Sequence, residues 1–181
     1  LQMHAGDRFP QITYTEALTI LSKSKAAFKV PVPVWGDGLA LEHERFLTDK
    51  HFKGPVFVTH YPAKCKPFYM RTTRNADSGV VEDNVSKERE TVEAFDFLVP
   101  GVGELAGGSA REDNFGLLAA KMQKLNLLSA DYSKALAASN GQSSSSLPMA
   151  QTDSRFLDWY LDLRRFGGSP SSGFGLGFER L

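Results

Sequence analysis

The sequence predicts an α+β fold in which helices flank an antiparallel β-sheet. Three observations support this prediction. Apolar stretches with strand-like alternation follow one another in the middle of the chain, turn residues join the two clearest of them, and S/T-x-x-E capping boxes mark helix starts on either side. With 181 residues, 41% hydrophobic and 23% charged, the chain is long enough for one domain with its own core.

The composition excludes several classes of protein. Lys and Arg number 21 and Asp and Glu also number 21, so there is no global basic surplus and any polynucleotide contact must be local. The single cysteine, Cys65, rules out an intrachain disulfide framework and a C-x-x-C metal site, which favours a reducing compartment. No apolar run approaches the roughly 20 residues of a membrane span, so we expect no membrane partner. The first residues show no targeting segment, although a sequence that begins at Leu1 is compatible with one upstream.

The first predicted helix covers residues 12–29. Thr13 and Glu16 form a capping box at its start, and Pro31 and Pro33 end it. Its inward-facing positions are Ala17, Leu18 and Leu21.

A second helix is predicted over residues 39–49, with Asp37 in the preceding turn as its cap. His43 lies on this helix between Glu42 and Glu44. Because these acids are adjacent to the histidine rather than three or four residues away, they do not share its helix face. We therefore interpret His43 as a lone surface histidine rather than a metal ligand.

Four strands are predicted in succession, which favours antiparallel pairing. The first is the apolar run 56–58, and the second, at residues 68–71, is expected beside it. Residues 72–91 are charged and aperiodic, so we interpret them as a flexible insertion. The third strand starts at Val92 and the fourth at Glu104.

The third and fourth strands form a predicted hairpin that brings two acids together. Alternation from Phe95 onward places Asp96 on the face opposite the aromatic rings. A turn then reverses the chain at Pro100, Gly101 and Gly103. We therefore expect Asp96 and Glu104 to lie within reach of one cation. The fourth strand is expected to end at Gly107 and Gly108, which let a ligand or another backbone approach closely.

A helix is predicted directly after this strand. Ser109 and Glu112 form its capping box, which places Arg111 in the first turn. A cation there opposes the helix dipole, so Arg111 either pairs with Asp113 or Glu112 on a solvated face or is retained for a ligand. The predicted buried stripe consists of Phe115, Leu118, Met122 and Leu125.

The C-terminal third contains a second flexible insertion, a helix and a glycine repeat. Residues 139–148 are of low complexity, and Asp153 or Ser154 is expected to cap the following helix. We interpret its aromatic stripe as core rather than as a base-stacking platform; the stripe comprises Phe156, Trp159, Tyr160 and Leu163. Glycine then occupies alternate positions, Gly173, Gly175 and Gly177. On a strand this pattern leaves one face without side chains as a floor for a planar ligand, and the alternative is a glycine-rich tail.

Five segments occur in a specific order along the chain: residues 35–47 (WGDGLALEHERFL), 61–71 (YPAKCKPFYMR), 96–112 (DFLVPGVGELAGGSARE), 159–167 (WYLDLRRFG) and 173–180 (GFGLGFER). Together they resemble the asparaginyl-tRNA synthetases, class II synthetases related to the aspartyl enzymes, and the last segment is similar to class II motif 3. The resemblance covers nearly the whole sequence. It implies part of a class II catalytic domain that activates asparagine with ATP and transfers it to tRNA(Asn).

The resemblance also implies roles for individual residues. Asp96 and Glu104 would bind the Mg²⁺ of ATP, and Glu104 would also contribute to the binding of ATP itself. Arg111 would hold the side-chain oxygen of asparagine, and Arg180 would stack on adenine or reach the terminal phosphate. Gly107, Gly108 and Ser109 would lie beside the amino acid, and Gly173, Gly175 and Gly177 would form the floor under ATP.

Two rival functions remain open. An aspartyl-tRNA synthetase or an asparagine synthetase on the same fold is the first, because guanidinium binds carboxylate even better than an amide oxygen. Glu112, where aspartyl relatives usually have isoleucine followed by histidine, favours asparagine. The second rival is a non-catalytic synthetase-like module that serves in binding or dimerisation.

Departures from the family pattern set further expectations. Motifs 1 and 2 and the anticodon-binding domain are expected outside this sequence, so the fragment alone should be inactive, and the full-length protein is expected to be a homodimer. Ser171 stands where many members have histidine. The insertions at 72–91 and 139–148 are longer than the bacterial pattern, which favours a eukaryotic enzyme of the cytoplasm or the mitochondrial matrix, with the organellar form preferred.

Overall fold

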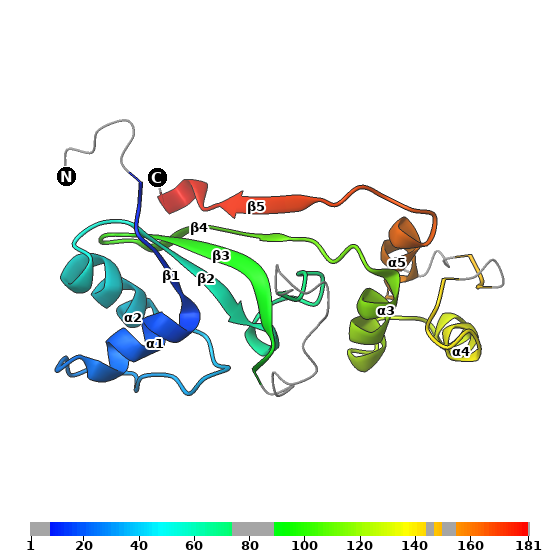
Figure 1. Cartoon of the computed structure of the whole chain (residues 1–181), viewed down its shortest axis with the longest axis horizontal. Coiled ribbons are helices and arrows are strands. Elements are labelled where there is room, and N and C mark those ends of the chain that lie inside the picture. The colour runs from blue at the N-terminus through cyan, green and yellow to red at the C-terminus, as the bar shows by residue number, and fades with distance from the viewer. Residues whose placement is uncertain (1–7, 74–88, 144–146, 150–154, 181) are drawn as a thin grey trace. The chain divides into compact units, whose positions relative to one another are not determined.

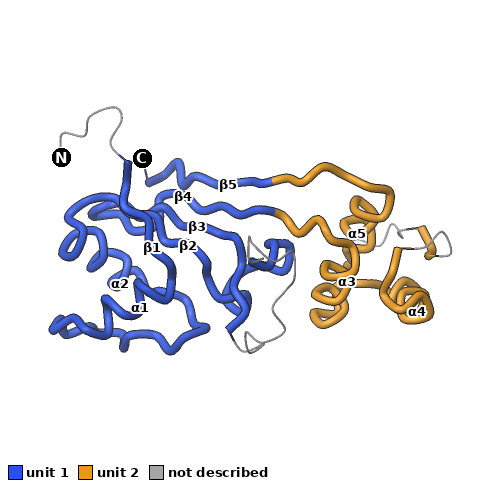
Figure 2. Tube along the Cα trace, viewed as in Figure 1, with its two compact units in different colours: residues 1–110, 172–181 blue, residues 111–171 orange. Residues whose placement is uncertain are grey.

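The computed structural model describes residues 8–73, 89–143, 147–149 and 155–180. The chain divides into two compact units, of which the first comprises residues 1–110 and 172–181 and the second residues 111–171 (Figure 2). The first unit is built on the sheet, and the second is helical. The predicted α+β class is confirmed.

The first unit contains a five-stranded sheet in the order β1-β2-β3-β4-β5 (Figure 1). The strands are β1 (Gln11–Thr13), β2 (Val56–Pro62), β3 (Thr91–Val99), β4 (Gly103–Ala110) and β5 (Ser172–Leu176). Neighbours pair antiparallel except β1 and β2, which are parallel. The antiparallel sheet is therefore confirmed, and β1 adds a short parallel edge that the sequence did not predict.

Helix α1 (Tyr14–Lys23) begins at the predicted capping box, in which the Thr13 side chain accepts from Glu16 N. The helix is shorter than the predicted range 12–29 at both ends. The residues before the helix belong to strand β1. After the helix, the amides of Lys29 and Val30 donate to the Glu42 carboxylate, which holds that segment out of the helix. Side chains buried against the sheet are Tyr14, Ala17 and Leu21.

Helix α2 (Leu41–Arg45) runs directly into a π-helical segment (Phe46–His51). The prediction that Asp37 caps this helix is wrong, because the N-cap is Ala40. The prediction of a surface histidine is also wrong, since His43 is 1% exposed. Its Nδ1 accepts from Ala40 N at 3.1 Å and its Nε2 lies 3.0 Å from the Val30 carbonyl oxygen, so His43 joins the helix start to the preceding loop.

The strand predicted at residues 68–71 does not form. Its expected partner, β2, already pairs with β1 on one side and β3 on the other, so no free edge remains for a sequence neighbour. The Arg71 amide instead donates to the Ala110 carbonyl, and Thr72 forms an isolated bridge with Val92. Most of the predicted insertion 72–91 lies outside the described residues.

In the described part of the second unit, three helices pack around buried side chains. They are α3 (Phe115–Lys124), α4 (Ala130–Ala138) and α5 (Asp158–Arg165). Their fully buried side chains include Leu118, Met122, Tyr132, Leu136 and Leu161. In the predicted stripe of α3, Leu118 and Met122 are buried but Leu125 is exposed. The break between α3 and α4 was not predicted.

The predicted inward stripe of α5 is wrong. Trp159 is 52% exposed and Leu163 is 53% exposed, while the helix buries Asp158 and Leu161. The Asp158 carboxylate accepts from the amide of Ser129 at 2.9 Å, which explains why a charged residue replaces an aromatic one on the inner face. The predicted caps Asp153 and Ser154 lie outside the described residues.

No helix among the described residues is long and apolar enough to cross a membrane.

Candidate active site

A row of residues in register crosses four strands of the sheet. Val58 on β2 lies opposite Asp96 on β3, Asp96 lies opposite Gly107 on β4, and Gly107 lies opposite Gly175 on β5. Residues directly opposite each other on neighbouring strands project to the same face. The Asp96 side chain therefore shares its face with two adjacent positions that carry no side chain.

The expectation that Asp96 points away from the aromatic rings is confirmed. Side chains at alternate positions of β3, from Val92 to Leu98, are buried, and Asp96 among them is 6% exposed. The intervening positions contribute Phe95 and Phe97 to the opposite face, where Phe57 stacks on Phe97 with ring centroids 4.5 Å apart.

A bulge in the hairpin brings Glu104 to the Asp96 face. Phe97 lies opposite Ala106, but Leu98 lies opposite Glu104, so β4 carries one extra residue, Leu105, at this point. Without the bulge, a position three residues from Gly107 would point to the other face, because strand side chains alternate. The bulge therefore gives Glu104 the same orientation as Asp96.

The two carboxylates meet above Gly107. A Cβ atom placed on this glycine would lie 2.7 Å from Glu104 Oε1 and 3.1 Å from Asp96 Oδ1. Both oxygens thus approach one point, and only glycine leaves that point open. The prediction that these two carboxylates lie within reach of one cation agrees with this geometry.

Lys66 is the first site residue that the sequence analysis did not assign. Its Nζ lies 2.8 Å and 2.7 Å from the two carboxylate oxygens of Asp96. The same Nζ lies 3.9 Å from the centroid of the Tyr61 ring. The Tyr61 side chain is buried beside Asp96. Its burial first, and then the nearby charge of Asp96, raise the pKa of Tyr61 well above its ordinary value.

Glu44 on α2 is the second unassigned residue. Its Oε2 accepts from the amide of Glu104 at 3.1 Å and fixes the start of β4 against the helix. At neighbouring Gly103, where φ is +92°, a Cβ atom would lie 2.7 Å from that same oxygen. The sequence around Glu44 did not indicate this contact, because Glu104 lies 60 residues further along the chain.

The clustered carboxylates perturb one another. Burial is the main cause that raises the pKa of Glu44; the hydrogen bond from Glu104 N opposes it, and the charges of Glu104 and Asp96 add to it. Burial and then the charge of Asp96 raise the pKa of Glu104, while Lys66 and Arg180 lower it. An additional cation would relieve this repulsion.

The carboxylate pair supplies oxygen donors of the kind that would hold a magnesium ion. No group of three or more His, Cys, Asp or Glu side chains among the described residues is arranged to hold a metal. Mg²⁺ is commonly bound by one or two carboxylates together with substrate phosphates and water. Glu104 and the adjacent oxygen of Asp96 over Gly107 match that donor set.

Arg180 and the glycine repeat lie next to the carboxylates in the first unit. Gly173 and Gly175 of the repeat lie in β5, and a Cβ atom at Gly175 would meet nothing within 4 Å, so the predicted floor is open at this position. The amide of Gly177 donates to the Leu105 carbonyl at 2.9 Å and extends the ladder beyond Leu176. An Arg180 guanidinium nitrogen donates to the Glu104 carbonyl oxygen, which places this cation at the carboxylate end of the floor.

The two neighbouring glycines of β4 face opposite sides of the sheet. A Cβ atom at Gly108 would lie 2.7 Å from the Phe95 ring and 2.8 Å from Phe174 Cβ, so Gly108 permits close packing on the aromatic face. Ser109 is 3% exposed and pairs with Ala94 and Gly173. It is a strand residue and not the predicted helix cap.

Arg111 opens the second unit directly after β4. The prediction of a capping box at Ser109 and Glu112 is wrong, because α3 starts at Phe115 with Asn114 as its cap. Arg111 is therefore not in a helical turn. Its amide donates to the Ser171 carbonyl at 2.8 Å, and the next carbonyl, that of Glu112, accepts from Arg164 Nε at 3.1 Å.

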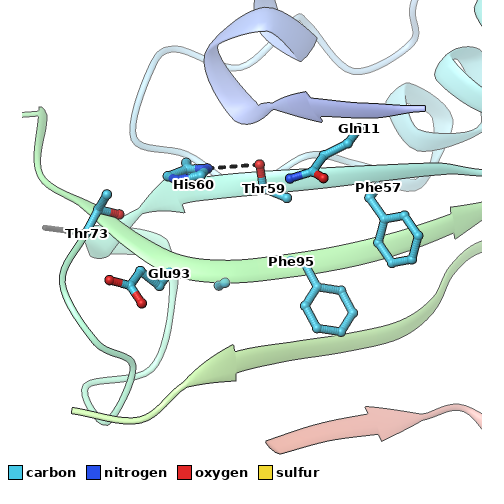
Figure 3. A pocket seen from close by; sticks show the side chains of 8 residues that line it. Gln11, Phe57, Thr59, His60, Thr73, Glu93 and Phe95 are labelled. Carbon is cyan, nitrogen blue, oxygen red and sulfur yellow. Dashed lines mark hydrogen bonds between the residues drawn. The ribbon is translucent and has the colours of Figure 1, made fainter. Parts of the chain in front are cut away.

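A hollow of about 580 Å³ lies among residues that include Phe57 and Phe95 (Figure 3). The two rings lie at one end and His60, Thr73 and Glu93 at the other. None of the predicted site residues lines it. A smaller hollow of about 260 Å³ includes two of them, Ser109 and Gly173.

Comparison with known proteins identifies the family of this chain. The family described as tRNA synthetases class II (D, K and N) matches residues 2–181, so the chain belongs to this family of class II synthetases. Within it, the chain is similar to asparagine–tRNA ligases. The ligase of Clostridium acetobutylicum is 43% identical over 176 residues, which are 97% of this chain and 30% of that relative. The chain thus spans about a third of the length of such relatives.

Solved structures give the same result. Asparaginyl-tRNA synthetase from Pyrococcus horikoshii, complexed with asparaginyl-adenylate, superposes with a TM-score of 0.63 at 34% identity and covers 96% of this chain and 30% of its own. The enzyme from Entamoeba histolytica, also in complex with asparaginyl-adenylate, gives a TM-score of 0.66 at 26% identity, with 99% and 32% covered. The expected resemblance to asparaginyl-tRNA synthetases is confirmed.

Proposed function

We propose that this chain forms part of the catalytic domain of an asparagine–tRNA ligase, which activates asparagine with ATP and transfers it to tRNA(Asn). The observation that carries the proposal is the pair of carboxylates, Asp96 and Glu104, that converges over Gly107 beside the open glycine position on β5. Relatives more than 40% identical over almost the whole chain are asparagine–tRNA ligases, which supports asparagine over aspartate.

The chemistry requires charge neutralisation more than a nucleophilic side chain. A carboxylate oxygen of asparagine attacks the α-phosphorus of ATP, the bond from that phosphorus to the bridging oxygen breaks, and pyrophosphate leaves. Two anions must meet, so positioning and positive charge supply most of the catalysis. Bound Mg²⁺ would supply neutralisation of the phosphates, and Asp96 and Glu104 would hold it.

The remaining site residues, apart from Gly108, keep their proposed roles. Arg180 would bind adenine or the terminal phosphate, and its contact with the Glu104 carbonyl favours the phosphate, since it lies at the carboxylate end. Arg111 would bind the side chain of asparagine. Gly107 and Ser109 keep their proposed place beside the amino acid, whereas Gly108 packs against Phe95 and Phe174 on the opposite face of the sheet. Gly173, Gly175 and Gly177 would form the floor under the nucleotide.

The proposal extends to the complete protein. We expect a homodimer in the cytoplasm or the mitochondrial matrix, with the organellar form favoured by the length of the insertions. Size-exclusion chromatography with light scattering and fractionation of the source cells test these two points.

An ATP–pyrophosphate exchange assay on the complete protein tests the reaction. Exchange that depends on asparagine, with aspartate inactive, is the expected result. Exchange with aspartate alone would contradict the choice of substrate, and no exchange with either amino acid would favour a non-catalytic module.

Substitution of Glu104 by Ala tests the metal role. We expect kcat for exchange to fall by at least about 100-fold, because a charge-stabilising ligand of the phosphates is lost, while circular dichroism shows an unchanged fold. Near-normal exchange would refute the role of Glu104.

Alanine at the two neighbouring glycines separates the two faces of β4. Gly107→Ala places a methyl group against both carboxylates, so we expect lost exchange activity with a small change in thermal stability. Gly108→Ala collides with Phe95 and Phe174, so a lower melting temperature is expected first. Equal effects of the two substitutions on both measurements would contradict this assignment of faces.

A further inference from the structure

The metal carboxylate Asp96 already has a cationic partner in the protein. Lys66 Nζ contacts both of its oxygens, at 2.8 Å and 2.7 Å, in a bidentate arrangement. The pair is well shielded, with side-chain exposures of 16% for Lys66 and 8% for Asp96. Screening by water is weak at such burial, so the attraction is stronger than that of a surface pair.

The chain around Lys66 holds this ammonium in place. It follows a short 3₁₀ helix (Ala63–Cys65), and its amide bonds back to the Ala63 carbonyl. The Cys65 thiol donates to the Pro62 carbonyl at 3.3 Å, and the Tyr61 ring lies under the Lys66 ammonium. Backbone and ring contacts therefore fix the position from which Lys66 reaches Asp96.

The neighbouring Lys64 shows that this placement is specific. Lys64 lies two residues earlier in the same loop, yet its side chain is 79% exposed and its ion pair with Asp37 is 3.8 Å long. Of these two lysines, only Lys66 directs its side chain to the carboxylate of Asp96.

The charges around the site set a limit on cation binding. The carboxylates of Asp96 and Glu104 converge over Gly107, and Lys66 lies directly on Asp96. The Glu44 carboxylate binds the amide of Glu104 nearby. A divalent cation that uses Asp96 must share that carboxylate with an ammonium. The two positive charges repel each other unless further negative charge arrives with the ligand.

We propose that Lys66 is a positioning residue that acts as the resident counter-ion of Asp96. It orients the carboxylate over Gly107 and makes binding of the divalent cation depend on the phosphates of the nucleotide. This inference rests on the proposed function and assigns to Lys66 a role that is separate from the metal ligands themselves.

Binding of Mn²⁺ to the complete protein, followed by electron paramagnetic resonance without nucleotide, tests the proposal. We expect weak binding to the wild type. Lys66→Met removes the positive charge, so Mn²⁺ should bind about tenfold more tightly without nucleotide. The gain on adding a non-hydrolysable ATP analogue should shrink by a similar factor.

Further variants separate charge from structure. Lys66→Gln loses the charge but keeps a hydrogen-bond donor, so its Mn²⁺ affinity should match that of Lys66→Met. If Lys66→Met fails to fold, the Mn²⁺ affinity of Lys66→Gln tests the inference in its place. Lys66→Arg keeps the charge and should restore the nucleotide dependence. Lys64→Met, the control in the same loop, should bind Mn²⁺ as the wild type does. Unchanged Mn²⁺ affinity in folded Lys66→Gln would overturn the inference.

Glu104→Ala distinguishes a failure of the inference about Lys66 from a failure of the proposed function. If Glu104→Ala abolishes nucleotide-dependent Mn²⁺ binding while Lys66→Gln resembles the wild type, only the role of Lys66 is wrong. If Glu104→Ala leaves Mn²⁺ binding and exchange unchanged, the proposed metal site itself fails, and the inference about Lys66 falls with it.

Discussion

Two regions of this chain carry the same local pattern and fold differently. Thr13 and Glu16 form a capping box at the start of α1, as predicted, with the Glu16 carboxylate accepting from Thr13 N at 2.7 Å. Ser109 and Glu112 have the same spacing, yet no helix begins there. The comparison shows when a capping motif decides the structure and when it does not.

The difference arises from pairing with distant strands. Thr13 is the last residue of β1, so the strand ends where the cap begins. Ser109, in contrast, lies between β3 and β5 and is paired with both, and β5 is more than 60 residues further along the chain. Two ladders hold Ser109 in an extended conformation, which a single cap of about 1 kcal/mol does not overcome.

Glu112 is used differently from Glu16. It is fully buried, and its carboxylate accepts from Lys121 Nζ of α3 at 3.1 Å. Glu112 therefore has a structural function, which is an ion pair with Lys121 in the last turn of α3 and a hydrogen bond from the amide of Asn114. It does not form the predicted capping box with Ser109.

Among the substitutions that test this difference between the two motifs, Glu112→Gln is expected to have the largest effect on stability. It removes the charge of the fully buried carboxylate that Lys121 binds, and we expect the free energy of unfolding to fall by about 2 kcal/mol. Urea denaturation of the complete protein, with hydrogen exchange of residues 115–124 to localise the loss, measures it. Lys124→Met, which removes an exposed charge from the last turn of α3, is the control and should change little. An equal effect of both substitutions would contradict a special role for the buried pair.

Asn114→Ala tests which residue caps α3. The Asn114 side chain accepts from the amide of Leu117 at 2.9 Å, so its loss should destabilise the helix by about 1 kcal/mol. Asn114→Asp keeps an acceptor at this position and should restore most of the stability. Hydrogen exchange of the first turn of α3 is the measurement, and unchanged protection in Asn114→Ala would show that the cap is elsewhere.

The same contrast explains how much of the fold could be predicted. The hairpin of β3 and β4 was found because its alternation and its turn are local. Residues 68–71 have strand-like composition but do not form a strand, since both edges of β2 are taken by distant segments. β1 and α4 were missed, the first because it has only three residues and the second because no strong breaker separates it from α3.

The site was predictable where its chemistry lies on one hairpin. Asp96 and Glu104 are close in sequence, and their convergence was expected, whereas the role of Gly107 as the open point between them was not. Lys66 and Glu44 reach the cluster from 30 and 60 residues away and lie in segments with many charges, so nothing local distinguished Lys66 from Lys64. Gly107 and Gly108 were grouped because the sequence shows adjacent glycines, whereas the strand directs them to opposite faces.

Glu16→Gln gives the smallest effect and tests the capping box that does form. The Thr13 amide, and then its hydroxyl, lower the pKa of Glu16, because both donate to its carboxylate. A carboxyl group with a lowered pKa in the folded state stabilises the fold above its unfolded pKa, and this contribution is lost as the pH falls. We therefore expect Glu16→Gln to lower the midpoint of thermal unfolding slightly at neutral pH and to match the wild type in acid. A difference that grows on acidification would show that the stabilisation by Glu16 does not come from its ionised form bound to Thr13.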